Sequence, residues 1–228
     1  MPIPNLRKTL ADPERLSPAA FARKRRFSLL HERFPQLPEM HVLDLGGEAH
    51  TWVREERRPR HVTLLNFGMK LDATREQIER EGASSWLTAV GGDACDPPEE
   101  VRDQDFDLVY SNSVFEHVGG HGPRRHFAYW AQTLAKHHWV QTPNRYFPVE
   151  PHWLAPGFQF ASPRLQAVLL GHWPLASPFY RKAEWPERVQ RAMSIELLSP
   201  AMMRIYFPES ELVRERMAGL AKSLIAVR

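Results

Sequence analysis

The chain has 228 residues, of which 43% are hydrophobic and 25% charged, a composition that is usual for folded proteins and excludes a disordered chain. Its length fits one elaborated domain better than two complete ones. The net charge of +3 is too small for a protein whose main partner is a phosphate backbone, so we predict no nucleic-acid partner.

The cysteine count and the hydropathy pattern bear on location. The single cysteine, Cys95, rules out an intramolecular disulfide. No apolar run approaches the roughly 18 residues that cross a bilayer, and no apolar stretch opens the sequence. We therefore predict a cytoplasmic protein without a membrane partner.

The first predicted element is a leading helix. The stretch "SPAAFARKRRFSLLHERF" puts Ser17 at an N-cap position and a proline in the first turn, with Phe21 and Phe34 among the residues of an apolar side. We assign residues 1–38 to an N-terminal helical extension. Its basic run "RKRR" is interpreted as a solvated helix face, with contact to an anionic ligand as the alternative.

Short apolar strands then alternate with polar or helical segments. Strands are predicted at residues 41–46, 61–67, 86–93 and 106–112, and "LDATREQIEREG" predicts a helix over 71–82. This alternation is typical of βαβ units and a mostly parallel sheet.

The pattern changes after a helix at 122–136 and a fifth strand at 137–143. Residues 144–183 are rich in aromatics, histidine and proline, too apolar for a disordered linker and too broken for one regular element. We interpret them as an inserted lid. After it, "LLSPAMMRIYF" predicts a short helix, and "SELVRERM" and "AKSLIAVR" predict two last strands.

Polar residues stand where four predicted strands end. Asp44 is followed by two glycines that would let the backbone approach a ligand, and Asn66, Asp93 and Asn112 close the next three strands. Ligands of open α/β sheets bind at this edge. Asp44 taken alone fits a helix cap equally well, but four such ends favour a ligand site.

This ordered series begins with Asp-x-Gly-Gly and ends in "FDLVYSNSVFEHV". It closely resembles the class I S-adenosylmethionine-dependent methyltransferases over roughly residues 40–145 and the last two strands. The stretch "HWVQTPNRYFPVEPHW" is also similar to some bacterial members with small-molecule substrates. The resemblance implies a single domain over 1–228 with an α/β fold: a Rossmann-like sheet of seven mostly parallel strands, helices on both faces, the last strand antiparallel, and the lid between strands five and six.

The resemblance implies that S-adenosylmethionine is the cofactor. Asp44, Gly46 and Gly47 would face its methionine part, and Asn112 would lie beneath the amino group and the sulfonium.

The adenosine part would meet the second and third strands. Asn66 stands where the family usually has an acid on the ribose hydroxyls, and Phe67 would lie against the adenine. Asp93 would accept from the adenine amino group, with the Ala94 N–H nearby. A buried adenine needs such an acceptor and an apolar face.

Two departures from the family pattern concern this cofactor. Glu48 and His50 replace the second and third glycines of the usual Asp-x-Gly-x-Gly-x-Gly turn, and Glu48 would crowd or repel the cofactor carboxylate unless a base such as Arg26 or His50 compensates. Asn66 lacks the charge-assisted bonds of an acid, which predicts weaker binding.

Methyl transfer needs an aligned nucleophile, and a general base where that nucleophile carries a proton. Histidine is the natural base near neutral pH. Of the eleven histidines, His117 is the best placed, and His152 in the lid, beside Glu150, is the second. A surface or structural histidine is the alternative for each.

The stretch around His117 also contains potential metal ligands. Glu116, His117 and His121 lie close in sequence, but two glycines between the histidines break the helix that would aim both rings one way. We therefore predict no metal site.

Other nucleotide sites fit less well. "GGEAHTW" does not satisfy Gly-x-Gly-x-x-Gly, and no Gly-Lys-Ser/Thr occurs, which disfavours dinucleotide and P-loop sites. A set of lid aromatics favours an acceptor pocket as much as a local core or a homodimer contact. These are Tyr146, Phe147, Trp153, Phe158, Phe160, Trp173, Phe179 and Tyr180.

The sequence thus predicts methyl transfer to a small-molecule substrate. Oxygen is favoured over nitrogen as the acceptor atom, because a hydroxyl depends more on a base. A cofactor-binding protein without catalysis, its turn closed by Glu48, is the alternative.

Overall fold

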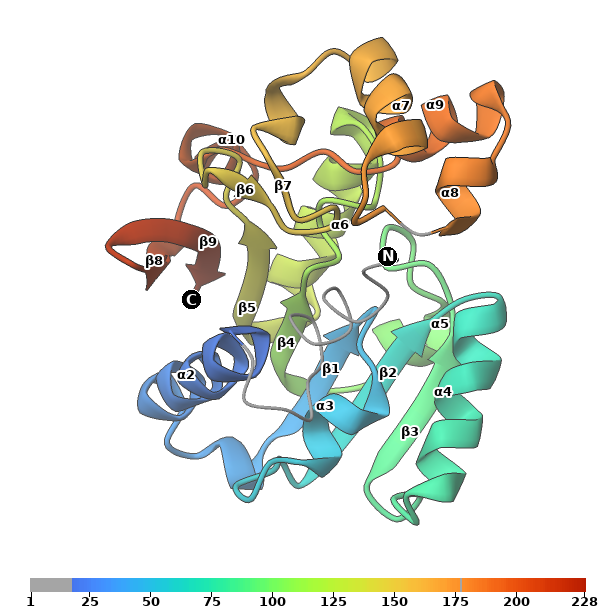
Figure 1. Ribbon diagram of the computed structural model, residues 1–228. Coiled ribbons are helices and arrows are strands. Elements are labelled where there is room, and N and C mark those ends of the chain that lie inside the picture. Colours follow the sequence, from blue (N-terminus) through green and yellow to red (C-terminus); the bar gives the residue numbers. More distant parts are fainter. Residues whose placement is uncertain (1–17, 177) are drawn as a thin grey trace.

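A seven-stranded sheet forms the centre of the molecule (Figure 1). The computed structural model describes residues 18–176 and 178–228, so the predicted N-cap, Ser17, and the start of the predicted extension lie outside the described residues. The strands are β1 (His41–Leu45), β2 (His61–Asn66), β3 (Leu87–Gly91), β4 (Phe106–Asn112), β5 (Ala135–Pro143), β8 (Glu211–Met217) and β9 (Leu220–Val227).

The order of the strands is β3-β2-β1-β4-β5-β9-β8. The neighbouring pairs among the first five strands are parallel, whereas β9 is antiparallel to both β5 and β8. The predicted Rossmann-like sheet with an antiparallel last strand is therefore confirmed. The chain reverses its direction of travel across the sheet between β1 and β4, which is where α/β sheets bind ligands.

Helices cover both faces of the sheet (Figure 1). They are α2 (Pro18–Arg33), α3 (Ala49–Val53), α4 (Met69–Arg80), α5 (Glu99–Arg102), α6 (His121–Thr133) and α10 (Pro200–Tyr206), with a 3-10 turn η1 (Leu37–Glu39). Successive strand residues alternate between two cores: Val42 packs with α2, and Leu43 packs with α6. This arrangement leaves the strand ends free to form a site.

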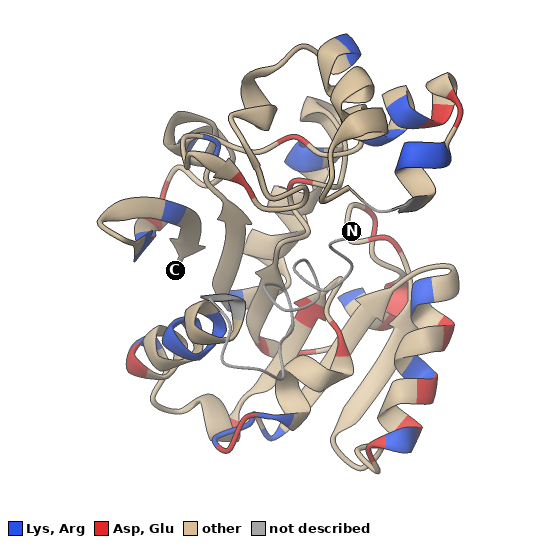
Figure 2. Ribbon diagram, viewed as in Figure 1, with Lys and Arg blue, Asp and Glu red and all other residues tan. Residues whose placement is uncertain are grey.

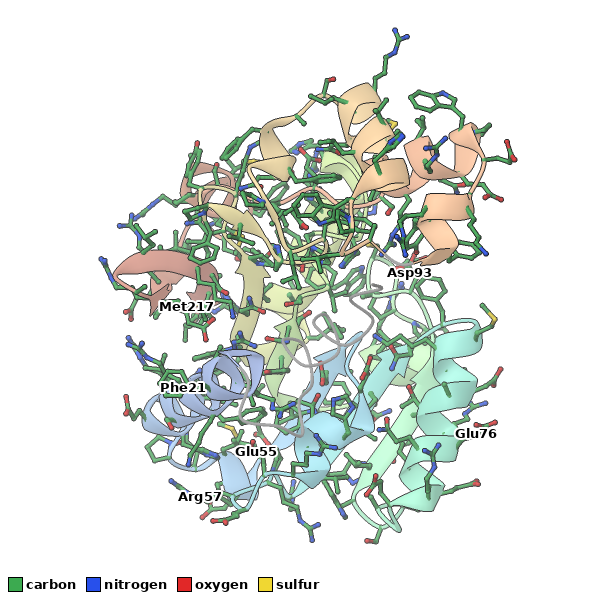
Figure 3. The ribbon with its side chains drawn as sticks, viewed as in Figure 1. Phe21, Glu55, Arg57, Glu76, Asp93 and Met217 are labelled. Atoms are coloured by element: carbon green, nitrogen blue, oxygen red, sulfur yellow. The ribbon has the colours of Figure 1, made fainter. Side chains whose placement is uncertain are left out.

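The leading helix α2 packs on the sheet through its second half. Phe27, Leu30 and Phe34 are buried, and the Phe27 ring meets Trp52 edge-on with 5.6 Å between ring centroids. Phe21, labelled in Figure 3, is 69% exposed, so its predicted place on the apolar side is wrong. Figure 2 shows the basic residues gathered along this helix.

Several predicted boundaries shift by about two residues. The helix predicted over 122–136 ends at Thr133, and β5 begins at Ala135 instead of residue 137, because Ala135 already pairs with Phe106 in the sheet. Strand pairing, which depends on distant residues, overrides the local helical pattern here. The short helices α3 and α5 were not predicted.

The segment between β5 and α10, residues 144–199, is called the inserted segment below. It contains β6 (Val149–Glu150), β7 (Ala155–Pro156), η2 (Phe158–Phe160), α7 (Pro163–His172), α8 (Pro178–Lys182) and α9 (Trp185–Met193). Figure 1 shows it on the side toward which β1, β4 and β5 point. Because α9 packs against α7, the insertion extends past residue 183, where the sequence suggested its end.

The inserted segment has a small core of its own. Trp153, Phe158 and Leu170 are buried there, and Trp173 and Tyr180 are partly buried against them. Other aromatics of the predicted set, Tyr146, Phe160 and Phe179, are exposed. Much of the aromatic content therefore holds this segment together. None of the described helices has the length and apolar character required to cross a membrane.

Candidate active site

Two adjoining cavities lie at the carboxyl ends of the central strands. The smaller, of about 410 Å³, includes residues from the ends of β1 and β4, and the larger, of about 1040 Å³, includes the ends of β2 and β3. Gly46, Lys70 and Val114 line both cavities, which therefore adjoin. The structure brings together here the residues predicted to bind the cofactor: Asp44, Gly46, Gly47, Asn66, Phe67, Asp93, Ala94 and Asn112.

The turn after β1 requires its two glycines. Gly46 has a φ of 76°, a left-handed conformation that a side chain would strain. A Cβ atom added to Gly47 would lie 1.8 Å from Oδ2 of Asp44. The Asp44 carboxylate therefore packs directly on the turn, in space that only glycine leaves open.

Asp44 is buried, and only one of its oxygens is satisfied. Oδ2 accepts a hydrogen bond from Trp52 Nε1 at 2.8 Å, whereas Oδ1 has no hydrogen-bond partner among the described residues. Burial raises the pKa of Asp44 to about 7, although the Trp52 bond and the charge of Lys70 oppose the shift. The helix-cap alternative is wrong, because Glu48 is the N-cap residue of α3. Asp44 thus offers an acceptor to a cation.

Glu48 is half-exposed and turned toward a base. Its Oε2 lies 3.1 Å from His50 Nδ1, and this contact lowers the pKa of Glu48. The Lys70 ammonium donates to the Gly46 carbonyl at 2.5 Å and also lowers the pKa of Glu48. Two basic groups therefore offset the carboxylate that replaces the family glycine.

Asn112 is held by the leading helix. Its Oδ1 accepts from Arg26 Nη1 at 2.5 Å, and Arg26 Nη2 lies 3.0 Å from Glu215 Oε2 of β8. The interpretation of "RKRR" as a wholly solvated face is therefore wrong for Arg26, which borders the smaller cavity.

Asn66 has its amide hydrogens engaged inside the protein. Nδ2 donates to the Gly47 carbonyl at 2.8 Å and to Thr74 Oγ1 at 3.3 Å. The side chain thus ties the glycine turn to β2, a structural role that sequence reasoning missed. Its carbonyl oxygen is what remains to accept from a ligand hydroxyl.

The far end of the larger cavity combines an apolar face with an acceptor. Phe67 is 70% exposed on the cavity wall. Asp93, labelled in Figure 3, is exposed, and its Oδ1 accepts from the Cys95 backbone N–H at 2.8 Å. The carboxylate of Asp93 is thus oriented by its own turn.

A cluster of two histidines and two glutamates lies beside the larger cavity, which His117 lines. His117 Nε2 is 3.1 Å from His152 Nε2, and His152 Nδ1 is 2.6 Å from Glu150 Oε1. Glu116 Oε1 is 4.0 Å from His117 Nε2 and 3.8 Å from His152 Nε2. The structure thus joins both predicted catalytic histidines, one from the β4–α6 loop and one from the inserted segment. His121 lies elsewhere, 3.0 Å from the Tyr206 hydroxyl.

Burial sets the charge of this cluster. Desolvation and the neighbouring His152 lower the pKa of His117 to about 4, so its ring is neutral at pH 7. Desolvation raises the pKa of Glu116 to about 7. Glu116 Oε2 accepts from Thr142 Oγ1 at 3.0 Å, which fixes the carboxylate in place.

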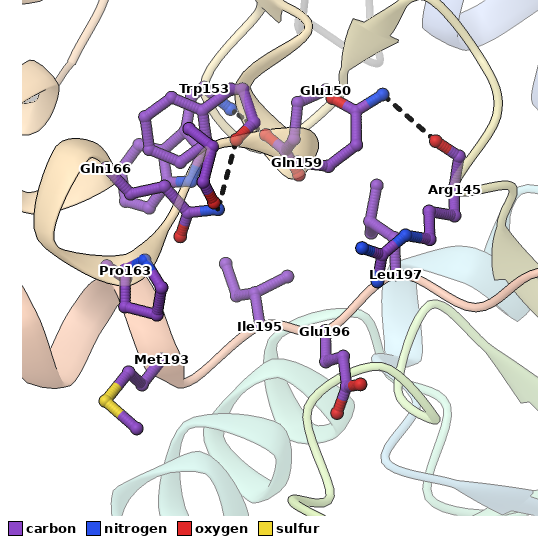
Figure 4. A pocket seen from close by; sticks show the side chains of 13 residues that line it. Arg145, Glu150, Trp153, Gln159, Pro163, Gln166, Met193, Ile195, Glu196 and Leu197 are labelled. Atoms are coloured by element: carbon purple, nitrogen blue, oxygen red, sulfur yellow. Dashed lines mark hydrogen bonds between the residues drawn. The ribbon is translucent and has the colours of Figure 1, made fainter.

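A third cavity, of about 280 Å³, lies within the inserted segment (Figure 4). Glu150, Trp153 and Gln159 are among the residues that line it. Gln159 Nε2 donates to the Arg145 carbonyl at 3.1 Å, while its Oε1 is buried without a partner in the described part of the chain. Glu150 connects this cavity to the histidine cluster through His152.

Comparison with known proteins identifies the domain. Residues 43–140 match a family described as "Methyltransferase domain". The matched residues, fewer than half of the chain, carry a methyltransferase domain. This match supports methyl transfer as the reaction class.

Solved structures share the fold of this chain at low sequence identity. The methyltransferase domain of bacterial CtHen1-C is 11% identical with a TM-score of 0.57, over 90% of this chain and 97% of that chain. An O-methyltransferase family protein from Burkholderia thailandensis is 16% identical with a TM-score of 0.52, over 92% of this chain and 58% of that chain. The N-methyltransferase NodS from Bradyrhizobium japonicum is 13% identical with a TM-score of 0.51, over 92% and 96%.

These likenesses concern the fold alone. The chain spans less than two thirds of some matched structures, the Burkholderia protein among them. No curated protein matches the chain.

Several residues of the candidate site were not predicted from the sequence. Trp52 binds Asp44, and Lys70 lies between the two cavities. Trp52 lies in the same short stretch as Asp44, and an indole donor eight residues after a buried acid is a usable signal. Nothing in the sequence near Lys70 indicates that its side chain reaches the turn after β1.

Proposed function

We propose that this methyltransferase transfers the methyl group of S-adenosylmethionine to a small-molecule acceptor, with oxygen favoured over nitrogen as the acceptor atom. The observation that carries the proposal is the pair of adjoining cavities, which gathers all the predicted cofactor residues. A nucleotide-linked amino acid needs two such compartments, one polar and charged and one with an apolar face.

The smaller cavity suits the methionine part of the cofactor. The unpartnered Oδ1 of Asp44 would accept from the ammonium group in a charge-assisted bond. Lys70 and Arg26 border the same cavity and would face the carboxylate. Because the Glu48 carboxylate is directed to His50, its repulsion of the cofactor is reduced, which disfavours the alternative of a protein that has lost catalysis.

The larger cavity suits the adenosine part. Phe67 presents an exposed ring to an adenine, and Asp93, next to the Ala94 N–H, supplies the acceptor that the adenine amino group requires. Asn66 has one oxygen for a ribose hydroxyl, since its amide hydrogens are engaged. We therefore expect weaker binding than an acid at this position would give.

The histidine cluster would serve the acceptor. A neutral His117 can accept the proton of an acceptor hydroxyl while the oxygen forms its bond to the methyl carbon and the carbon–sulfur bond breaks. His152, held by Glu150 at 2.6 Å, would position the His117 ring. The cavity of Figure 4, with the unpartnered Gln159 Oε1, offers space and a polar contact to the acceptor.

Other features of the proposal come from the sequence. A cytoplasmic location, the absence of membrane and nucleic-acid partners, and a homodimer stay predictions. The O- and N-methyltransferase neighbours differ in their acceptor atom, so the preference for oxygen depends on the proposed base alone.

Isothermal titration with S-adenosylmethionine and S-adenosylhomocysteine tests the cofactor site. We expect both to bind, and Gly47→Ala to abolish binding because its methyl group would displace the Asp44 carboxylate. Gly120→Ala is the matched control, since a Cβ there meets no described atom within 4 Å. No binding by the wild-type protein at high micromolar concentration would overturn the proposal.

The acceptor preference needs a separate assay. Pairs of small acceptors that differ only in a hydroxyl or an amine would be incubated with the cofactor, and the products measured by mass spectrometry. O-methylated products are expected to dominate, and methylation of amines alone would overturn the oxygen preference.

A further inference from the structure

Three potential metal ligands converge on one point in the histidine cluster. They are Nε2 of His117, Nε2 of His152 and Oε1 of Glu116, and all three lie within 4.8 Å of one another. Glu116 is 1% exposed, and its Oε1 has no hydrogen-bond partner among the described residues. A buried carboxylate oxygen without a partner is costly unless a cation meets it.

The surrounding hydrogen bonds direct lone pairs toward this point. His152 Nδ1 is 2.6 Å from Glu150 Oε1 and donates to this carboxylate, which turns Nε2 toward His117. His117 makes a hydrogen bond to the backbone of Ser194 that raises its pKa, which means that the ring is the donor. A neutral imidazole that donates from Nδ1 keeps Nε2 as an acceptor or metal ligand. The two Nε2 atoms lie 3.1 Å apart, close enough to share one cation.

The distances suit a metal ion. From the separations of 3.1, 3.8 and 4.0 Å, the point equidistant from the three atoms lies about 2.1 Å from each of them. Bonds from zinc to imidazole nitrogen and carboxylate oxygen are about 2.0–2.2 Å long. The cluster therefore accepts an ion with little movement of the side chains.

Hydrogen bonds hold the potential ligands in place, as they usually do in metal sites. Glu150 holds one ligating imidazole and Thr142 holds the ligating carboxylate at 3.0 Å, the arrangement that orients ligands and raises their basicity. Arg191, near His117, is a cation, but two carboxylates outweigh it, and its guanidinium lies over the rings of Trp153 and Tyr180.

We propose that Glu116, His117 and His152 bind one divalent transition-metal ion, with Zn²⁺ as the reference ion. Two imidazoles and one carboxylate suit zinc and its first-row neighbours, whereas Mg²⁺ prefers oxygen ligands alone. Three protein ligands leave a position open for water or an acceptor oxygen. The sequence pointed to His121 as the second histidine, but the fold supplies His152 from the inserted segment.

The ion-binding proposal does not depend on methyl transfer, although it shares residues with the proposed function. With an ion bound, both Nε2 lone pairs face the ion, so the proton-accepting role proposed for His117 belongs to the ion-free protein. The two proposals are therefore measured separately, one by Zn²⁺ binding and one by S-adenosylmethionine binding.

The test uses the full chain without an affinity tag, treated with a chelator and then titrated with Zn²⁺ in a calorimeter. We expect one Zn²⁺ per chain, and no binding of Mg²⁺ at the same concentrations. Co²⁺ should give visible absorption bands of a site with nitrogen and oxygen ligands. Absence of stoichiometric Zn²⁺ binding, or equal binding of Mg²⁺, overturns the proposal.

Variants locate the site. Glu116→Gln keeps the shape of the side chain but should weaken Zn²⁺ binding at least about tenfold, and Glu150→Gln should weaken it about 10–100-fold through His152. His172→Ala, which changes an exposed histidine of α7, is the matched control and should bind like the wild type. Circular dichroism of the ion-free variants checks their folding.

Two outcomes for the variants decide the proposal. Selective loss of Zn²⁺ binding in folded Glu116→Gln supports it, and wild-type affinity in that variant overturns it. Failure of the wild type to bind S-adenosylmethionine while it still binds Zn²⁺ would count against the proposed function only.

Discussion

The carboxyl edge of the sheet and the inserted segment meet at the histidine cluster, but they are stabilised in different ways. The edge is fixed by parallel strand pairing and by two large cores, one on each face. The inserted segment has two-residue strands and one small core around Trp153. Glu116 and His117 follow β4, whereas His152 belongs to the segment with the smaller core. Cofactor binding and catalysis should therefore differ in their sensitivity to disorder of the inserted segment.

Trp153→Ala should have the largest effect among the variants that test this difference. Removal of a buried tryptophan costs about 3–5 kcal/mol, more than a small core of this kind can lose and stay ordered. We expect faster proteolysis and hydrogen exchange over residues 144–199 and loss of turnover. The affinity for S-adenosylmethionine should stay within about threefold of wild type, because none of the predicted cofactor residues lies in the segment.

Trp185→Ala is the matched control for that variant. Trp185 lies in the same segment but is 40% exposed, so its loss should leave both order and turnover nearly unchanged. A parallel fall in cofactor affinity and segment order in Trp153→Ala would show that the two regions are not separable.

His117→Ala tests the sheet side of the cluster. Turnover of any acceptor that the wild type methylates should fall about 10²-fold, the usual contribution of a general base, while cofactor affinity is kept. Steady-state kinetics and calorimetry give the two quantities, with His172→Ala as the control. Unchanged turnover would transfer the role to His152 or show that the reaction needs no base.

The two regions also differ in what their sequences reveal. The strand ends could be predicted because an apolar run followed by a polar residue is a local pattern. Parallel pairing of the strands then places these polar residues at one edge of the sheet. The pairing of Trp52 with Asp44 and the reach of Lys70 could not, because they depend on where α3 and α4 pack. In the inserted segment the aromatic content predicted an apolar unit. The contact between His152 and His117 cannot be predicted from the local sequence, because 34 residues separate them in the chain.

The free energy of unfolding should also depend on pH through Asp44, at the carboxyl edge of the sheet. We expect this effect to be the smallest of those predicted here. Burial raises its pKa from 3.8 to about 7, so between these values the unfolded chain ionises while the folded chain stays protonated. The free energy of unfolding therefore falls as pH rises, by at most about 1.4 kcal/mol per pH unit, and Asp44→Asn removes this slope. Denaturant unfolding of the cofactor-free protein and the variant at pH 5 and 6.5 measures the difference, in which histidine titrations cancel. Glu48→Gln should leave the slope between pH 5 and 6.5 unchanged, because the pKa of Glu48 is lowered from 4.5 and the group is ionised in both states above that pH. Parallel curves for wild type and Asp44→Asn would mean that the Asp44 carboxylate is solvated, and the ammonium site proposed at this edge would lose its support.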